Sequence, residues 1–175
     1  MTFEPDQSFV ALFCEILIAA VFLTSGGAKL LNLQSFVETV RRFELLPDSL
    51  ARFVGYVLPF TEVMLGLLLL VDFYRVLLLG IAVALLLTFS FGMAVNLIRG
   101  KTDISCGCFG SSKESLTWFL VVRNVVIIGV ALTASLTAAG SVGFGERALA
   151  VLTVASLITS YYFYGLIVKF WQLRF

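Results

Sequence analysis

Five long apolar stretches fill most of this chain, and each contains at most two charged residues. They cover approximately residues 8–33, 50–71, 76–97, 116–139 and 148–169. A helix needs about 20 apolar residues to cross the hydrocarbon core of a bilayer, so each stretch is long enough to span a membrane. The sequence therefore predicts an all-α polytopic membrane protein, residues 1–175 forming a single domain of five transmembrane helices with a four-helix-bundle core.

The composition excludes several other classes of protein. Hydrophobic residues make up 60% of the 175 residues, and the formal net charge is +1. Soluble domains contain about 45–50% apolar residues, and so small a net charge creates no field for a polyanion, so a soluble enzyme and a nucleic-acid binder are excluded. Histidine is absent, which removes the usual haem ligand, the Ser-His-Asp triad and the Cys/His zinc site. We therefore expect neither haem nor metal.

The segment after the first span has a different pattern. Within residues 34–46, Phe36, Val40 and Phe43 fall on one helical face, and charged residues occupy the others. This distribution is typical of an amphipathic helix lying in the membrane interface, and Pro47 is expected to end it.

Five spans divide the connecting segments between two sides of the membrane. The turns 72–75 and 140–147 share one side, with Arg75 and Arg147 as its basic residues. The opposite side holds the polar loop 99–115 and has nine basic residues: Lys29, Arg41, Arg42, Arg52, Arg99, Lys101, Lys113, Lys169 and Arg174. The positive-inside rule therefore predicts a cytoplasmic loop.

Two cysteines in this loop, Cys106 and Cys108, are the sharpest local feature. Thiols separated by one residue can close a very small disulfide ring, and the intervening Gly107 permits the backbone that this ring requires. A strained disulfide is readily reduced, so it suits exchange with another protein. A static bridge, two separate small residues and a metal site are the alternatives, although two thiolates supply only half of a tetrahedral site.

Three other polar or sulfur-containing residues are expected to lie outside any site. Cys14 lies near the end of the first span that faces away from the loop, roughly 20 Å or more from it by helix rise. We interpret Cys14 as a small hydrophobic residue, which leaves the chain with one dithiol. Glu15 and Asn96 are expected to lie near the interface.

Charged residues inside the spans form the second feature. Glu62 and Arg123 lie within the second and fourth spans, and Asn124 follows Arg123. A charge facing lipid costs about 3 kcal/mol or more, so both should face the bundle interior. Two interpretations stay open: a structural Glu62–Arg123 ion pair, or a polar cavity that binds a ligand or carries protons. Lys29 is expected to extend its ammonium to the interface.

Several segments resemble the MauE family of methylamine-utilisation proteins, itself similar to DoxX-type membrane proteins. The matching segments cover about residues 14–130 in the same order, and they are GGAKL at 26–30, ELLP at 44–47, PFTEVMLGLLLL at 59–70, Arg99-Gly100, CGCFG at 106–110 and VVRN at 121–124. The resemblance implies a role, with a thioredoxin-like partner, in forming disulfides while a periplasmic amine dehydrogenase matures.

The resemblance also suggests a mechanistic kinship with quinone-linked disulfide-forming membrane proteins such as DsbB and the vitamin K epoxide reductase family. Those proteins are helical bundles with a quinone beside a reactive cysteine. This chain departs from them because its one pair is separated by a single residue and no second pair is present. That difference favours direct contact between the Cys106-Gly107-Cys108 motif, the partner and the electron acceptor.

The predicted function is that of a membrane thiol–disulfide oxidoreductase coupled to the quinone pool, with Cys106 and Cys108 exchanging a disulfide with the partner. Arg123 would stabilise negative charge on a thiolate or a reduced quinone, and Glu62 would orient Arg123 or move protons. The predicted quinone-binding residues are Arg123, Asn124, Glu62 and Lys29.

Two other functions are compatible with the sequence: a non-catalytic membrane scaffold or chaperone for the maturing dehydrogenase, and a carrier that passes reductant or a metal across the bilayer. The predicted location is the bacterial inner membrane. An oxidase acting on a periplasmic partner needs the cysteine loop outside the cytoplasm, whereas the distribution of Lys and Arg favours the inside.

Overall fold

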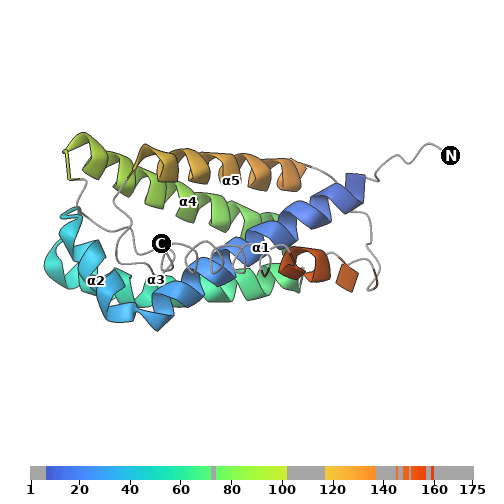
Figure 1. The fold of residues 1–175 in the computed structure, drawn as a ribbon, viewed down its shortest axis with the longest axis horizontal. Helices are drawn as coiled ribbons and strands as arrows, with labels where there is room; N and C mark the ends of the chain where they lie inside the picture. Colours follow the sequence, from blue (N-terminus) through green and yellow to red (C-terminus); the bar gives the residue numbers. More distant parts are fainter. Residues whose placement is uncertain are drawn as a thin grey trace, which may run out of the picture.

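The structure is a computed structural model that describes residues 7–71, 74–101, 117–136, 145, 148–149, 151–156 and 159. Its helices are α1 (Gln7–Leu31), α2 (Leu33–Arg42), α3 (Asp48–Leu70), α4 (Arg75–Ile98) and α5 (Trp118–Leu136). The four long helices lie side by side as a bundle, and the short α2 lies at one end of it (Figure 1). Each of these four is long and apolar enough to cross a membrane. The prediction of an all-helical, polytopic membrane protein is therefore confirmed.

The predicted fifth span, residues 148–169, lies largely outside the described residues. Within it, residues 151–156 are helical. Val154 packs against Leu12 and Ile16 of α1, so this segment contacts the bundle near the beginning of the chain. The cysteine loop falls within residues 102–116, which also lie outside the described part of the chain.

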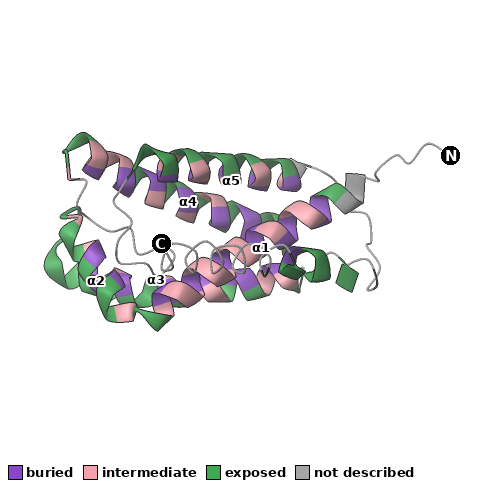
Figure 2. Cartoon of the chain, in the orientation of Figure 1, coloured by how far each residue is buried: buried purple, intermediate pink, exposed green. Residues whose placement is uncertain are grey.

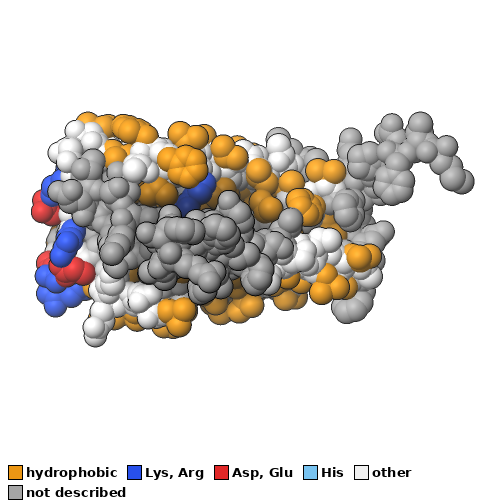
Figure 3. Space-filling model, in the orientation of Figure 1, with side chains coloured by type: hydrophobic (Ala, Val, Ile, Leu, Met, Phe, Trp, Pro, Cys, Tyr) orange, Lys and Arg blue, Asp and Glu red, His pale blue; other side chains and the backbone are white. Residues whose placement is uncertain are grey.

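The bundle core lies between α1 and the three other long helices. Ile18 and Phe22 of α1 pack with Leu65 of α3, Leu79 of α4 and Ala131 of α5. The inward helix faces are buried and the outward faces are exposed (Figure 2). Hydrophobic side chains cover the flanks of the bundle, while charged side chains gather at the end where α2 lies (Figure 3). An apolar flank of this extent is the surface that a lipid bilayer solvates.

Two glycines let α1 and α3 approach closely. A Cβ atom on Gly26 would lie 2.9 Å from Val63 Cγ2, and one on Gly66 would lie 2.7 Å from Leu23 Cγ. Neither helix could carry a larger residue at these points without moving apart. In a membrane, where helices gain little from hydrophobic transfer, such small residues permit the close packing that holds them together.

The amphipathic helix ends earlier than predicted. It was expected over residues 34–46, but α2 ends at Arg42. Glu44 has a left-handed backbone with φ of 49°, a conformation that terminates an α-helix. The following linker turns back toward the bundle, so Leu45 and Leu46 reach a cavity beneath α2. The amphipathic character of α2 is confirmed, because Phe36, Val37 and Thr39 are its buried residues.

Candidate functional site

A buried ion pair joins α1 to α3. The Nζ atom of Lys29 donates a hydrogen bond to Oε1 of Glu62, and the two residues are 1% and 2% exposed. The prediction that Lys29 reaches the interface is therefore wrong. The reason is the position of α2, because the ring of its buried Phe36 faces the ammonium group.

Two aromatic rings complete the surroundings of the Lys29 ammonium. Nζ lies 4.3 Å from the centroid of the Phe89 ring and 5.0 Å from that of Phe36. A cation over an aromatic face is attracted by the negative face of the ring, and this attraction strengthens away from water. The Lys29 ammonium is thus held by one carboxylate and two aromatic rings, which come from three different helices.

The spacing within two sequence motifs explains how this pair forms. Gly26 and Lys29 lie one helical turn apart on the same face of α1, as Pro59 and Glu62 do on α3. A Cβ atom on Gly26 would lie 3.0 Å from Glu62 Cβ and 3.1 Å from the Pro59 carbonyl oxygen. The glycine therefore provides the close approach of the helices, and the lysine one turn later meets the carboxylate.

A cavity of about 100 Å³ opens beside the ion pair, and all four long helices contribute to its wall. Its polar lining consists of Ser25, Lys29, Glu62, Arg123 and Asn124, and its apolar lining includes Phe89. The sequence-predicted ligand residues Lys29, Glu62, Arg123 and Asn124 thus meet at one site. With two cationic side chains and one carboxylate, the formal charge of this lining is +1, which favours a ligand with electron-rich oxygens.

The structure corrects one of the two interpretations of the embedded charges. The ion-pair partner of Glu62 is Lys29, so the predicted Glu62–Arg123 pair is wrong. The reason is the close contact of α1 with α3, which the spacing of charges along the chain does not reveal. The predicted polar cavity is present, and Glu62 and Arg123 both line it.

The cysteine loop follows α4 at the end of the bundle where α2 lies. Cys106 and Cys108 lie outside the described residues, but Lys101, where the loop begins, forms an ion pair of 2.6 Å with Glu44 in the linker after α2. This half-buried cation lowers the pKa of the exposed Glu44 carboxyl below its usual value. Arg123 is the sixth residue of α5, which places it about 8 Å of helix rise from the beginning of that helix.

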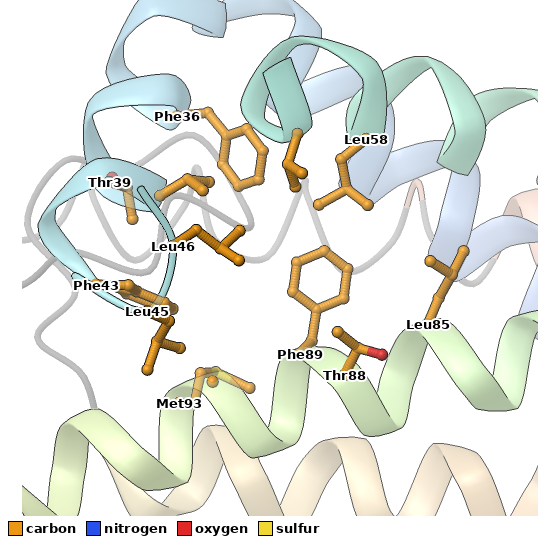
Figure 4. A pocket seen from close by; sticks show the side chains of 13 residues that line it. Phe36, Thr39, Phe43, Leu45, Leu46, Leu58, Leu85, Thr88, Phe89 and Met93 are labelled. Carbon is orange, nitrogen blue, oxygen red and sulfur yellow. The ribbon is translucent and has the colours of Figure 1, made fainter. Parts of the chain in front are cut away.

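A second, larger cavity was not predicted. It measures about 140 Å³ and lies between α2, the linker that follows it, α3 and α4. In Figure 4 the side chains of Phe36, Leu58 and Phe89 point into it from three helices. The apolar face of α2 was visible in the sequence, but the backward turn of the linker that closes this cavity was not.

A second buried ion pair lies at the opposite end of the bundle. Arg75 Nε lies 3.1 Å from Glu15 Oε2, and Arg75 Nη2 donates to the Ala134 carbonyl oxygen at 2.8 Å. Glu15 and Asn96, expected near the interface, are 2% and 0% exposed. Both are therefore buried within the bundle rather than exposed at the interface, and neither lines the polar cavity. Cys14 is partly buried and packs on the bundle core, as expected of a small hydrophobic residue.

The family model and two relatives that match this chain carry the same name. The profile of the family "Methylamine utilisation protein MauE" matches residues 7–139. The chain is 35% identical over 158 residues to the methylamine utilization protein MauE of Paracoccus denitrificans, which covers 89% of this chain and 85% of that protein. It is 36% identical to the protein of that name from Paracoccus versutus, over 83% of this chain and 80% of that protein. No solved structure matches the chain significantly.

Proposed function

The chain belongs to the MauE family, and we propose that it acts in methylamine utilisation as a membrane thiol–disulfide oxidoreductase that helps a periplasmic dehydrogenase mature. One observation carries the proposal. Four helices bring Lys29, Glu62, Arg123 and Asn124 to one cavity inside the bundle. The segment that contains Cys106 and Cys108 follows α4, whose end lies beside the linker after α2. An embedded polar cavity suited to electron-rich oxygens, in a chain that has one closely spaced dithiol, is what we expect of an electron-transferring membrane protein.

The proposed exchange starts from a disulfide between Cys106 and Cys108. A thiolate of a reduced thioredoxin-like partner attacks one of these sulfurs, which forms a mixed disulfide and releases the other cysteine as a thiolate. The second thiol of the partner then attacks the mixed disulfide. The partner leaves as a disulfide, and Cys106 and Cys108 are left reduced by two electrons and two protons.

The reduced cysteines, Cys106 and Cys108, must pass those electrons on to an acceptor. A quinone from the membrane supplies this acceptor, because it takes up two electrons and two protons. The ammonium of Lys29 and the guanidinium of Arg123 stabilise the negative charge that develops on an accepting oxygen. Glu62 holds Lys29 in place, which replaces its predicted role of orienting Arg123. The amide of Asn124 supplies a hydrogen-bond donor at the same wall.

Covalent geometry limits how far the dithiol can lie from the end of α4. Cys106 follows Lys101 by five residues, and five extended residues span at most about 18 Å. Lys101 itself lies beside the linker after α2. A second cysteine pair is therefore not required to cover a long distance, in keeping with the single dithiol of this chain.

The proposal places five spans in a bacterial cell membrane, with the cysteine loop on the extracytoplasmic side. The burial of Lys29 and Arg75 changes the charge comparison, because both are internal residues rather than loop cations. Eight basic residues then remain on the loop side and one on the other, counted from the sequence. This count favours a cytoplasmic loop under the positive-inside rule. We place the loop outside because the proposed partner is periplasmic.

A scaffold or chaperone is the second candidate function. Its support is that the two described buried ion pairs, Lys29–Glu62 and Glu15–Arg75, each join α1 to another helix and so have a structural use. In a protein that only held a maturation complex together, these two ion pairs would serve only to hold the helices together.

Serine substitutions separate the two functions. Cys106→Ser and Cys108→Ser are introduced singly into a Cys14→Ala background, which serves as the control, and membrane abundance is measured beside the disulfide state of the maturing dehydrogenase. We expect normal abundance, reduced dehydrogenase, and a trapped mixed disulfide with the partner in one of the two variants. Normal disulfides in both variants would overturn the oxidoreductase proposal in favour of the scaffold.

A further inference from the structure

The cavity beneath α2 has the size and lining of a site for a small apolar group. Its volume is about 140 Å³, and Phe36, Leu58, Leu85 and Met93 are among its lining side chains. An apolar cavity of about 150 Å³ in another protein holds a single benzene ring. The cavity beneath α2 therefore has room for about one ring or one branched five-carbon unit, and a complete acyl chain of a phospholipid would not fit.

The apolar cavity and the polar cavity share one lining residue among those described. Phe89 lines both cavities, and its ring also faces the Lys29 ammonium at 4.3 Å. Phe36 of α2 lines the apolar cavity, and the centroid of its ring lies 5.0 Å from the same ammonium. The charged wall and the apolar space are thus joined through the Phe89 ring.

The two cavities differ in the chemistry that they accept. The polar one presents Lys29, Arg123 and Asn124, which suit carbonyl oxygens, whereas polar side chains in the apolar one are confined to threonines. At about 100 Å³ the polar cavity is smaller than the cavity that holds one benzene ring, so by itself it is too small for a substituted ring. A ligand with a flat head that bears carbonyl groups and a short branched apolar unit directly attached to it fits the pair of cavities better than either one alone.

We propose that the two cavities are the chambers of one site for an isoprenoid quinone. The quinone ring lies against Arg123 and Asn124, the first isoprenoid unit fills the chamber beneath α2, and rotation of Phe89 connects the two chambers. This inference rests on the proposed function, since it names the ligand of the same redox site and the residues that select its tail.

The energetic consequence of the apolar chamber is modest. An isoprenoid tail enters it from lipid rather than from water, so transfer gains little and the attraction comes from packing. The chamber should therefore decide which quinones bind more than how tightly the ring itself is held.

Gly92 offers a way to fill this chamber. A Cβ atom on Gly92 would make ordinary contacts, 3.5 Å to Leu45 Cδ1 and 3.6 Å to the Phe43 ring, so Gly92→Ala fits and Gly92→Leu extends into the space. Gly80 lies on the same helix with nothing within 4 Å, so Gly80→Leu adds the same bulk outside the site. Thr88→Phe, at an exposed edge of the chamber, narrows it without touching the helix contact at Gly92.

The test measures quinone binding to the full chain in lipid nanodiscs by quenching of tryptophan fluorescence. The ligands are a benzoquinone with one isoprenoid unit and the same ring with a methyl group in its place. We expect Gly92→Leu and Thr88→Phe to weaken binding of the prenylated quinone about tenfold. Gly80→Leu should leave this affinity unchanged, and the methylated ring should bind all variants alike.

The outcomes distinguish this inference from the proposed function. Equal affinity of wild type and both filled variants for the prenylated quinone would overturn the two-chamber site but leave quinone-linked thiol exchange standing. Failure of wild type to bind either quinone would overturn both the site and the quinone coupling. A phospholipid that mass spectrometry finds bound to purified wild type but not to purified Gly92→Leu would overturn the quinone assignment of the apolar chamber.

Discussion

Lys29 and Glu62 form an ion pair that is buried between α1 and α3 and covered by the rings of Phe36 and Phe89. The pair lies where Gly26 allows the two helices to approach, and it also forms part of the polar cavity wall. One arrangement therefore serves both the cohesion of the bundle and the electrostatics of the candidate site.

Removing one partner of this pair should be far more damaging than removing both. Lys29→Met or Glu62→Gln leaves a buried charge without its partner, a change that costs about 3–5 kcal/mol. We expect each single variant to show low membrane abundance and a lowered unfolding temperature in detergent. The double variant should recover much of this stability.

The recovered double variant also tests the function of the pair. At normal abundance it should remain defective in quinone-linked thiol oxidation, because the cavity has lost its ammonium and carboxylate. Full activity in the stable double variant would show that the pair is structural only.

Gly26 and its neighbour Gly27 form a matched pair for testing the helix contact. Gly26→Ala brings a methyl group within 2.9 Å of Val63 Cγ2, whereas Gly27→Ala meets nothing within 4 Å. We expect Gly26→Ala to lower the free energy of unfolding by about 1–3 kcal/mol, and Gly27→Ala to be neutral or slightly stabilising. Thermal unfolding in detergent compares them, and equal unfolding temperatures would contradict the close approach of α1 and α3.

Arg75 should need its guanidinium and not only its charge. Its side chain contacts Glu15 of α1 and the Ala134 carbonyl of α5 with two different nitrogens, a geometry that lysine does not reproduce. Arg75→Lys should lower the free energy of unfolding by about 1–3 kcal/mol. Chemical denaturation measures this loss.

The same variant should keep its thiol chemistry. Arg75 begins α4 and the cysteine loop follows its other end, which is about 36 Å away by helix rise. We expect thiol exchange per correctly inserted molecule to match wild type. A lower specific rate with Arg75→Lys would connect the two ends functionally, against our assignment.

The side on which the cysteine loop lies can be read with a membrane-impermeant maleimide in intact spheroplasts. In chains without other cysteines, Arg42→Cys reports the loop end and Val71→Cys the opposite end, since both positions are exposed. The proposal expects Arg42→Cys, and Cys106 and Cys108 after reduction, to react from outside, while Val71→Cys reacts only after the membrane is opened. The reverse pattern would place the dithiol in the cytoplasm, and the oxidase proposal would fall.

Much of the helical layout was predictable because spans and amphipathic helices follow from local patterns. The predicted first span, residues 8–33, corresponds to α1 at Gln7–Leu31, and the span 76–97 corresponds to α4 at Arg75–Ile98. Length and apolar composition suffice here because a helix must satisfy its backbone hydrogen bonds internally to cross a bilayer. The early end of α2 was missed, since the left-handed backbone of Glu44 leaves no such pattern.

The candidate site was predictable only as a set of residues. Burial of the embedded charges follows from the cost of placing them in lipid, so Glu62, Arg123 and Asn124 could be assigned to the interior. Lys29 was assigned to the interface, because a lysine near a helix end normally reaches water. Nothing local to Lys29 indicates that Phe36, from the next helix, closes that route.

The sequence by itself determined that this chain crosses a membrane as helices and that α2 is amphipathic. It also singled out a few embedded charges and one closely spaced dithiol as the candidate functional groups. Only the tertiary structure decided that Lys29 rather than Arg123 pairs with Glu62 and that two cavities meet at Phe89. The physical reason is that hydrophobicity and helical period act along a segment of the chain. Pairing and cavity shape instead depend on how closely two helices pack, and here small residues such as Gly26, remote in sequence from Glu62, set that distance.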